Sequence, residues 1–149
     1  MGKEKDPASE QQKNGLAQVD PCTMVSPEVL ASFGLRGPGE PETGNSSEPG
    51  CYFPGDPISG TFYKNQEKTV AAYGAQQSTW AKFDPLQVDG RSAASAVANG
   101  STQAGVCSTL FDTGGGVIIL TVSNKGDNAI DPCAKSLKIA EAIAPRMPR

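Results

Sequence analysis

Apolar residues are sparse in the first 19 positions and recur at regular spacing only after them. The stretch 1–19 is rich in Lys, Glu, Gln and Asn. Such a composition cannot offset the entropy of ordering the chain. We therefore predict a flexible polar tether over residues 1–19 and a single folded domain over residues 20–149.

The first segment with a helical pattern starts at the Ser-Pro-Glu sequence of residues 26–28. It supplies a capping hydroxyl, a proline at the first helical position and an acid in the first turn. The predicted helix directs Val29, Leu30 and Phe33 toward the core. It ends at Gly34, a residue type that commonly terminates helices.

A second helix is predicted from Asp131 as the cap and Pro132 in the first turn. At about 100° per residue its apolar residues fall on one side. These residues are Cys133, Leu137, Ala140, Ile143, Ala144 and Met147. The opposite side carries Lys135, Lys138 and Glu141, so we expect the helix to lie with its apolar side on a sheet.

Short apolar runs between turn residues predict strands. The predicted strands are 51–53, 58–64, 86–88, 91–97, 105–111 and 117–122. Asp89-Gly90 is a typical hairpin turn, residues 67–80 favour a short helix interrupted at Gly74, and residues 36–50 indicate a loop. The pattern predicts an α+β fold in which N-terminal and C-terminal helices pack on an antiparallel sheet of about six strands.

Length and charge exclude several classes of protein. The chain has 149 residues, the size of one domain, and a net charge of −3. No cluster of Lys and Arg is dense enough to follow a phosphate backbone, so we expect no nucleic-acid partner. No run approaches the roughly 20 apolar residues of a membrane span. The N-terminus also lacks the apolar segment of a signal peptide, and we expect a mature domain that starts at an added Met-Gly.

The chain has four cysteines and no histidine, which limits the metal and disulfide chemistry available to it. No Cys-x-x-Cys pair is present, and the wide spacing lacks the close ligand pairs of structural zinc sites. We predict two disulfides and an oxidising compartment, with free buried thiols as the alternative. Pairing in chain order, Cys22 with Cys51 and Cys107 with Cys133, would link each helix start to a nearby strand.

The sequence predicts no catalytic residues, no cofactor and no metal site. Without histidine, Ser-His-Asp and Cys-His hydrolases are excluded. Residues 111–114 contain the Asp-Thr-Gly of aspartic proteases, but those enzymes need two such carboxylates and the chain has one copy. We interpret the motif as a hairpin turn in which Asp112 bonds its own backbone.

Aromatic residues and loop carboxylates are the remaining candidates for a binding or catalytic site. Tyr63, Tyr73, Trp80 and Phe83 could line a groove, although such residues more often belong to a core. Glu42, Glu48 and Asp56 lie in predicted loops, and a glycosidase-type carboxylate pair among such residues stays open.

An ordered set of motifs resembles a known family. The set comprises Asp-Pro-Cys at 20–22 with Ser-Pro-Glu at 26–28, a cysteine opening the first strand, Asp-Pro-Leu-Gln-Val-Asp-Gly-Arg-Ser-Ala at 84–93, and Asp-Pro-Cys at 131–133 before the last helix. Residues 19–148 thereby resemble actinobacterial cell-envelope lipoproteins of unknown function, which are similar in fold to PsbP-like α/β sandwiches. The resemblance implies a lipid anchor on a cysteine upstream of residue 2, and it supplies only structural cysteines.

The resemblance and the composition together favour a binding or accessory module outside the cytoplasm, held at the cell membrane by a lipid anchor. We expect it to engage an envelope protein or a small envelope ligand through a sheet face or the 36–50 loop. A ligand-sensing domain of an envelope signalling system and a carboxylate-based hydrolase are the alternatives. A deep apolar pocket would favour ligand binding, and two facing carboxylates would favour hydrolysis.

Overall fold

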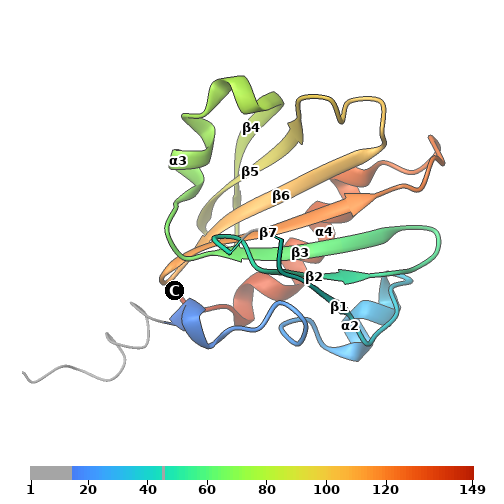
Figure 1. Ribbon diagram of the computed structural model, residues 1–149, viewed down its shortest axis with the longest axis horizontal. Coiled ribbons are helices and arrows are strands. Elements are labelled where there is room, and N and C mark those ends of the chain that lie inside the picture. Colours follow the sequence, from blue (N-terminus) through green and yellow to red (C-terminus); the bar gives the residue numbers. More distant parts are fainter. Residues whose placement is uncertain (1–14, 45) are drawn as a thin grey trace, which may run out of the picture.

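A computed structural model describes residues 15–44 and 46–149 (Figure 1). Seven strands form one antiparallel sheet in the order β1-β2-β3-β7-β6-β5-β4. The strands are β1 Glu40–Glu42, β2 Gly50–Phe53, β3 Ser59–Asn65, β4 Trp80–Val88, β5 Arg91–Ala98, β6 Val106–Thr113 and β7 Gly116–Ser123. The helices are η1 Gly15–Gln18, α2 Pro27–Ser32, α3 Val70–Gly74, η2 Gln77–Thr79, α4 Pro132–Ile143 and η3 Ala144–Arg146.

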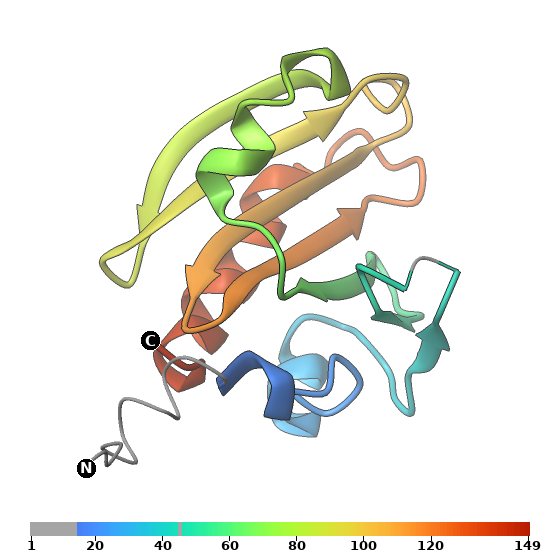
Figure 2. The same ribbon diagram turned by 60° about the vertical axis from the view of Figure 1, so that its left-hand side comes forward.

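Helices cover both faces of the sheet, with α3 on one side and α4 on the other (Figure 2). The larger core lies under α4, α2 and η1 and includes Leu16, Leu30, Phe62, Phe111 and Ile139. The smaller core lies under α3 and includes Val70, Tyr73, Leu110 and Val117. Strand alternation produces both cores, because neighbouring residues of one strand point to opposite faces.

The α+β class and the antiparallel sheet are confirmed, whereas the predicted number of about six strands is too low. The missed strand is β1, which lies inside the predicted 36–50 loop and pairs Pro41 with Cys51. All three β1 residues are exposed and none is aliphatic, so no apolar pattern marks the strand. Proline is tolerated there because β1 is an edge strand whose outer side needs no backbone donor.

Strand β4 is also longer than predicted and begins at Trp80, a residue that the sequence pattern assigns to a short helix. Its central residues pair with β5, and Pro85 lies opposite Ala94 in this pairing. Pro85 and the ion pair between Lys82 and Asp84 interrupt the apolar alternation that would reveal a strand. As the other edge strand of the sheet, β4 can accommodate that proline.

The predicted boundary between tether and domain is placed too late. Residues Gly15–Gln18 form η1, and the side chain of Leu16 is fully buried in the larger core. The Lys64 ammonium donates to the carbonyl oxygens of Leu16 and Val19 at 3.0 and 2.7 Å. One leucine and one distant lysine thus anchor a segment whose overall composition is polar. The rest of the predicted tether, residues 1–14, lies outside the described residues.

Helix α4 begins as predicted, with Asp131 accepting from the Cys133 amide at 2.9 Å. Its buried side is rotated relative to the predicted one, because Ile139 and Ser136 are fully buried while Cys133 and Leu137 are only partly buried. The Ser136 hydroxyl donates to the Leu120 carbonyl oxygen at 2.6 Å. This hydrogen bond makes burial of a serine against β7 possible.

The first described residues and the C-terminus converge at the β6–β7 turn, as Figure 1 shows. The amide of Leu16 donates to Gly114, and the amide of Gly114 donates to Pro148. Buried Arg91 donates to the carbonyl oxygens of Ala144, Met147, Pro148 and Asp112 at distances of 2.7 to 3.1 Å. A single guanidinium therefore fixes the end of the α4 segment to the sheet.

Two disulfides join the helical layer to the sheet in chain order, as expected from the sequence. Cys22, in a turn ahead of α2, is bonded to Cys51 of β2. Cys133, in the first turn of α4, is bonded to Cys107 of β6. Each bond therefore ties the start of a helical segment to a strand.

Candidate functional site

An apolar pocket of about 710 Å³ lies between α2 and residues 35–39. Its floor consists of Val25, Leu30, Leu35 and Phe53, each no more than 5% exposed. Pro27 and Ala31 of α2 and Pro38 of the facing segment form exposed parts of its rim. A volume of this size falls in the range of small-molecule sites.

Glycines and backbone hydrogen bonds hold the two walls of this pocket, here called the α2 pocket. Gly34 ends α2 with a φ of +79°, the left-handed conformation that reverses the chain. The next residues run back along the β2–β3 turn, where the Arg36 amide donates to the Pro54 carbonyl oxygen at 2.8 Å. At Gly39 a β-carbon would lie 2.3 Å from the Cys51 sulfur, so only glycine allows the backbone to rest on the disulfide.

Charge in the α2 pocket is confined to Arg36, the single charged residue of its lining. Thr23 adds a hydroxyl at the rim, and the remaining lining residues are apolar or glycine, together with Cys22 of the disulfide. Arg36 makes no ion pair within residues 15–44 and 46–149. The pocket therefore joins an apolar floor to one uncompensated positive charge.

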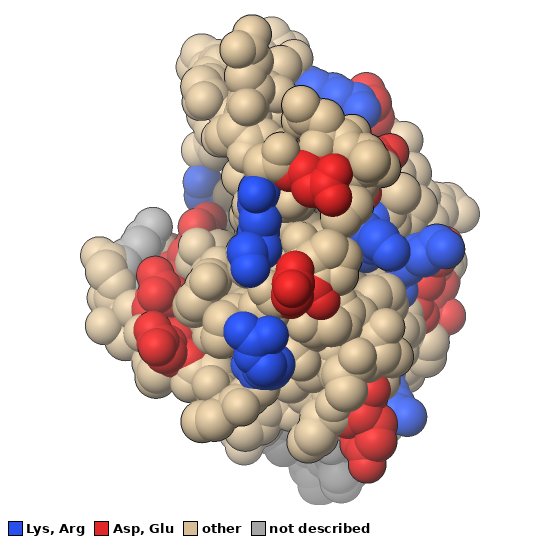
Figure 3. Space-filling model, turned by 90° about the vertical axis from the view of Figure 1, so that its right-hand side faces the viewer, with Lys and Arg blue, Asp and Glu red and all other residues tan. Residues whose placement is uncertain are grey.

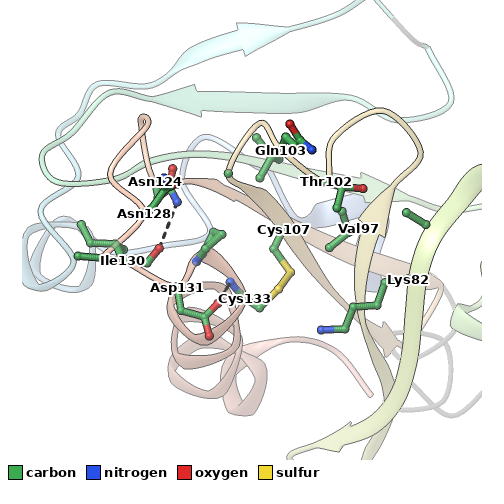
Figure 4. A pocket seen from close by; sticks show the side chains of 15 residues that line it. Lys82, Val97, Thr102, Gln103, Cys107, Asn124, Asn128, Ile130, Asp131 and Cys133 are labelled. Atoms are coloured by element: carbon green, nitrogen blue, oxygen red, sulfur yellow. Dashed lines mark hydrogen bonds between the residues drawn. A yellow bond between two sulfur atoms is a disulfide. The ribbon is translucent and has the colours of Figure 1, made fainter.

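A second, more polar hollow of about 470 Å³ lies beside the first turn of α4 (Figure 4). The Cys107–Cys133 disulfide, Lys82 and Asp131 contribute to its lining. Asn124 is 3% exposed, but its amide is satisfied, because it donates to the Ile130 carbonyl oxygen and accepts from the Gly126 amide. The buried amide of this hollow therefore needs no hydrogen-bond partner from a ligand.

Surface charge does not single out a site on the face seen in Figure 3. Lysine and arginine side chains are interspersed there with aspartate and glutamate. Within the described ranges, no three Cys, Asp or Glu residues group as a metal site would require.

The predicted aromatic candidates lie on the opposite face of the sheet from the α2 pocket. Tyr73, Trp80 and Phe83 form one cluster, with ring centroids 6.3 Å apart for the first pair and 5.4 Å for the second. The Trp80 indole donates to the Tyr73 carbonyl oxygen at 2.8 Å, and Tyr63 packs at the margin of the same core. Phe83 also lines a hollow of about 480 Å³. A role of these four aromatic residues in binding stays a prediction.

Glu48, one of the loop carboxylates, is engaged in a polar cluster at this aromatic core. Its carboxylate accepts from the Tyr73 hydroxyl and, at 3.4 Å, from the Asn65 amide, which also donates to the Tyr73 hydroxyl at 2.9 Å. Burial and then the neighbouring Glu48 carboxylate raise the pKa of Tyr73 above its usual 10.0. The cluster fastens the segment before β2 to α3.

The interpretation of Asp112 as a residue that bonds its own turn is wrong. Asp112 belongs to β6, and the turn consists of Gly114 and Gly115 between the paired residues Thr113 and Gly116. The Asp112 carboxylate instead accepts from the Val70 amide at the start of α3, at 2.8 Å. Its partner is 42 positions away, which no local motif can reveal.

The residues of the α2 pocket were not among the predicted site residues. The 36–50 loop was predicted as a possible contact region, and its first residues, Arg36 to Gly39, do form one wall. The other wall comes from α2, whose Leu30 was assigned only to the core. A Pro- and Gly-rich segment between a helix and a cysteine-bearing strand is the signal that could have located the pocket.

The fold and the α2 pocket define a disulfide-linked α+β domain with an apolar recess beside α2. Over residues 2–146 the chain matches the model of a family described as a protein of unknown function, DUF3558. The chain belongs to this family. No curated protein and no solved structure matches it.

Proposed function

We propose that this chain is a binding or accessory domain of the cell envelope that takes up a hydrophobic ligand in the α2 pocket. The observation that carries the proposal is a recess of about 710 Å³ whose rim exposes Pro27, Ala31 and Pro38 above an apolar floor. Apolar surface that stays open in a folded domain gains free energy when a ligand covers it.

Location outside the cytoplasm is the second part of the proposal. Disulfides persist mainly in oxidising compartments, and all four cysteines of this chain form them. The motif set that resembles actinobacterial envelope lipoproteins supports a lipid anchor and a PsbP-like fold. No helix among the described residues is long and apolar enough to cross a membrane, and the anchor would hold the domain at the membrane surface.

A ligand-sensing domain is the nearest alternative, because it would use the same pocket. A carboxylate-based hydrolase is less well supported, since no acidic residue lines the α2 pocket. Glu48, one of the loop carboxylates, is bonded to Tyr73 on the other face of the sheet. The pocket thus favours binding over hydrolysis.

Fluorescence of an uncharged apolar probe, N-phenylnaphthylamine, tests the binding proposal. The wild type should enhance its emission with one saturable site. Ala31→Phe places a ring at the exposed rim of the pocket and should abolish most of the enhancement. Ala142→Phe, at an exposed position of α4, is the matched control and should bind like the wild type. Equal binding by both variants, or none by the wild type, would refute the proposal.

Protease accessibility tests the location. In cells that express the full-length gene, protease added outside intact spheroplasts should degrade the protein. Protection until the membrane is opened would place the chain in the cytoplasm and contradict this part of the proposal.

A further inference from the structure

The distribution of charge around the α2 pocket carries information about the ligand. Arg36 follows directly on Leu35, whose side chain is 4% exposed and belongs to the pocket floor. Arg36 itself is exposed at the rim. The boundary between apolar floor and solvent therefore coincides with a cationic side chain.

The local charge opposes that of the whole molecule. The chain has a net charge of −3, which disfavours anions in general. At the pocket, however, the lining contains one cation and no acidic residue, and Arg36 forms no ion pair with any residue that the structure describes. A guanidinium forms paired hydrogen bonds with a planar carboxylate.

We infer that the α2 pocket binds a single-chain carboxylate amphiphile, a fatty acid, with the acyl chain on the apolar floor and the carboxylate on Arg36. The inference rests on the proposed function and adds the class of ligand. One positive charge at the rim matches the single negative charge of a carboxylate. The floor offers no hydrogen-bond donor or acceptor side chain, so it accommodates the methylene chain and leaves the polar group at the rim.

The backbone of the rim leaves room for the carboxylate. At Gly37 a β-carbon would meet nothing closer than the Gly39 nitrogen at 4.0 Å, so the space beside Arg36 is open. The Thr23 hydroxyl also lies at the exposed rim, where its single proton is shared with the Asp20 carbonyl oxygen at 3.5 Å, so Arg36 is the main donor for the carboxylate.

Isothermal titration calorimetry with dodecanoate, below its micelle concentration and at low ionic strength, tests the inference. The comparison amphiphile is dodecyltrimethylammonium, which has the same chain length and the opposite charge. We expect one dodecanoate per chain and much weaker binding of the cation. Arg36→Gln should weaken dodecanoate binding about five- to tenfold, and Arg36→Lys by less, because the charge is kept but the paired geometry is lost.

A neutral probe separates failure of this inference from failure of the proposed function. Arg36→Gln should bind N-phenylnaphthylamine like the wild type, whereas Ala31→Phe should lose both the probe and dodecanoate. If the probe binds in the pocket but dodecanoate binds no better than the cation, or Arg36→Gln does not weaken it, the fatty-acid inference is wrong and the proposed function stands. If Ala31→Phe leaves both unaffected, both are wrong.

Discussion

At the scale of single residues, helix α3 depends on an acceptor from a distant strand. Asp112 accepts from the Val70 amide at 2.8 Å, and Thr69 accepts from the Ala72 amide at 3.1 Å. Asp112→Asn keeps an acceptor oxygen and should change the free energy of unfolding by less than about 0.5 kcal/mol, whereas Asp112→Ala should cost about 1 kcal/mol. Urea denaturation of both variants measures this difference. Equal losses in the two would show that the carboxylate charge, and not the acceptor, matters.

The Tyr73 hydroxyl gives a pH-dependent signature of the Glu48 cluster. Burial, followed by the hydrogen bond and charge of Glu48, raises the pKa of Tyr73 above 10.0. Above that pH the unfolded chain loses the phenolic proton while the folded chain keeps it, so this group's contribution to stability is lost as pH rises. Ultraviolet titration should show that Tyr73 loses its phenolic proton at a higher pH than a free tyrosine. Glu48→Gln should lower the pKa of Tyr73. An unchanged titration in Glu48→Gln would contradict the role of this carboxylate.

Residue roles of this kind were the least predictable from the sequence. The capping residues Ser26 and Asp131 act within three positions of themselves, and their roles follow from local pattern. Asp112 and Lys64 bond to backbone groups more than 40 positions away. Their partners are set by the way the strands assemble, which a linear pattern does not encode.

At the scale of elements, η1 is a short segment that the structure makes part of the domain. Leu16 is fully buried, and the Lys64 ammonium bonds to the carbonyl oxygens of Leu16 and Val19. A chain that begins at Asp20 should lose about 2–4 kcal/mol of unfolding free energy relative to one that begins at Gly15. Thermal denaturation of the two chains provides the measurement. Equal midpoints would restore the predicted boundary at residue 20.

Elements with a clear apolar period were predictable, whereas the edge strand β1 was missed and only residues 86–88 of the edge strand β4 were predicted. The strands 106–113 and 116–123 lie at the centre of the sheet, so their apolar residues identify them. The edge strands β1 and β4 contact one neighbour each and carry Pro41 and Pro85. Edge strands use prolines and charges that prevent further pairing, and the same residues conceal them in a sequence.

At the scale of the whole molecule, the two disulfides have different expected consequences. They span 29 and 26 positions, so each should stabilise the domain by about 3–4 kcal/mol in the loop-entropy model. Cys22 and the backbone at Gly39, which rests on Cys51, also belong to the α2 pocket. Replacing Cys22 and Cys51 with serine should therefore weaken probe binding as well as stability.

Serine replacement of Cys107 and Cys133 is the matched control for the first disulfide. It should lower the denaturation midpoint but leave binding of N-phenylnaphthylamine unchanged under conditions where the variant remains folded. Loss of binding in both double variants would mean that the pocket depends on global stability and not on the Cys22–Cys51 bond.

The architecture as a whole was more accessible from the sequence than the candidate site. Turn residues, strand periodicity and cysteine spacing led to an α+β fold with two chain-order disulfides. The α2 pocket arises where Leu30, Leu35 and Phe53 come together from separate elements. Each of these residues alone indicates only a core position, and their position together beneath one recess exists only in three dimensions.

Chemical-shift mapping in ¹H–¹⁵N spectra tests the central claim, binding in the α2 pocket, most directly. During titration with N-phenylnaphthylamine, amide shifts should concentrate in residues 23–39 and near Phe53. The amides of the aromatic cluster around Tyr73 and Trp80, on the other face of the sheet, should stay unchanged. Shifts concentrated at that cluster, with none along α2, would contradict the account and assign binding to the opposite face.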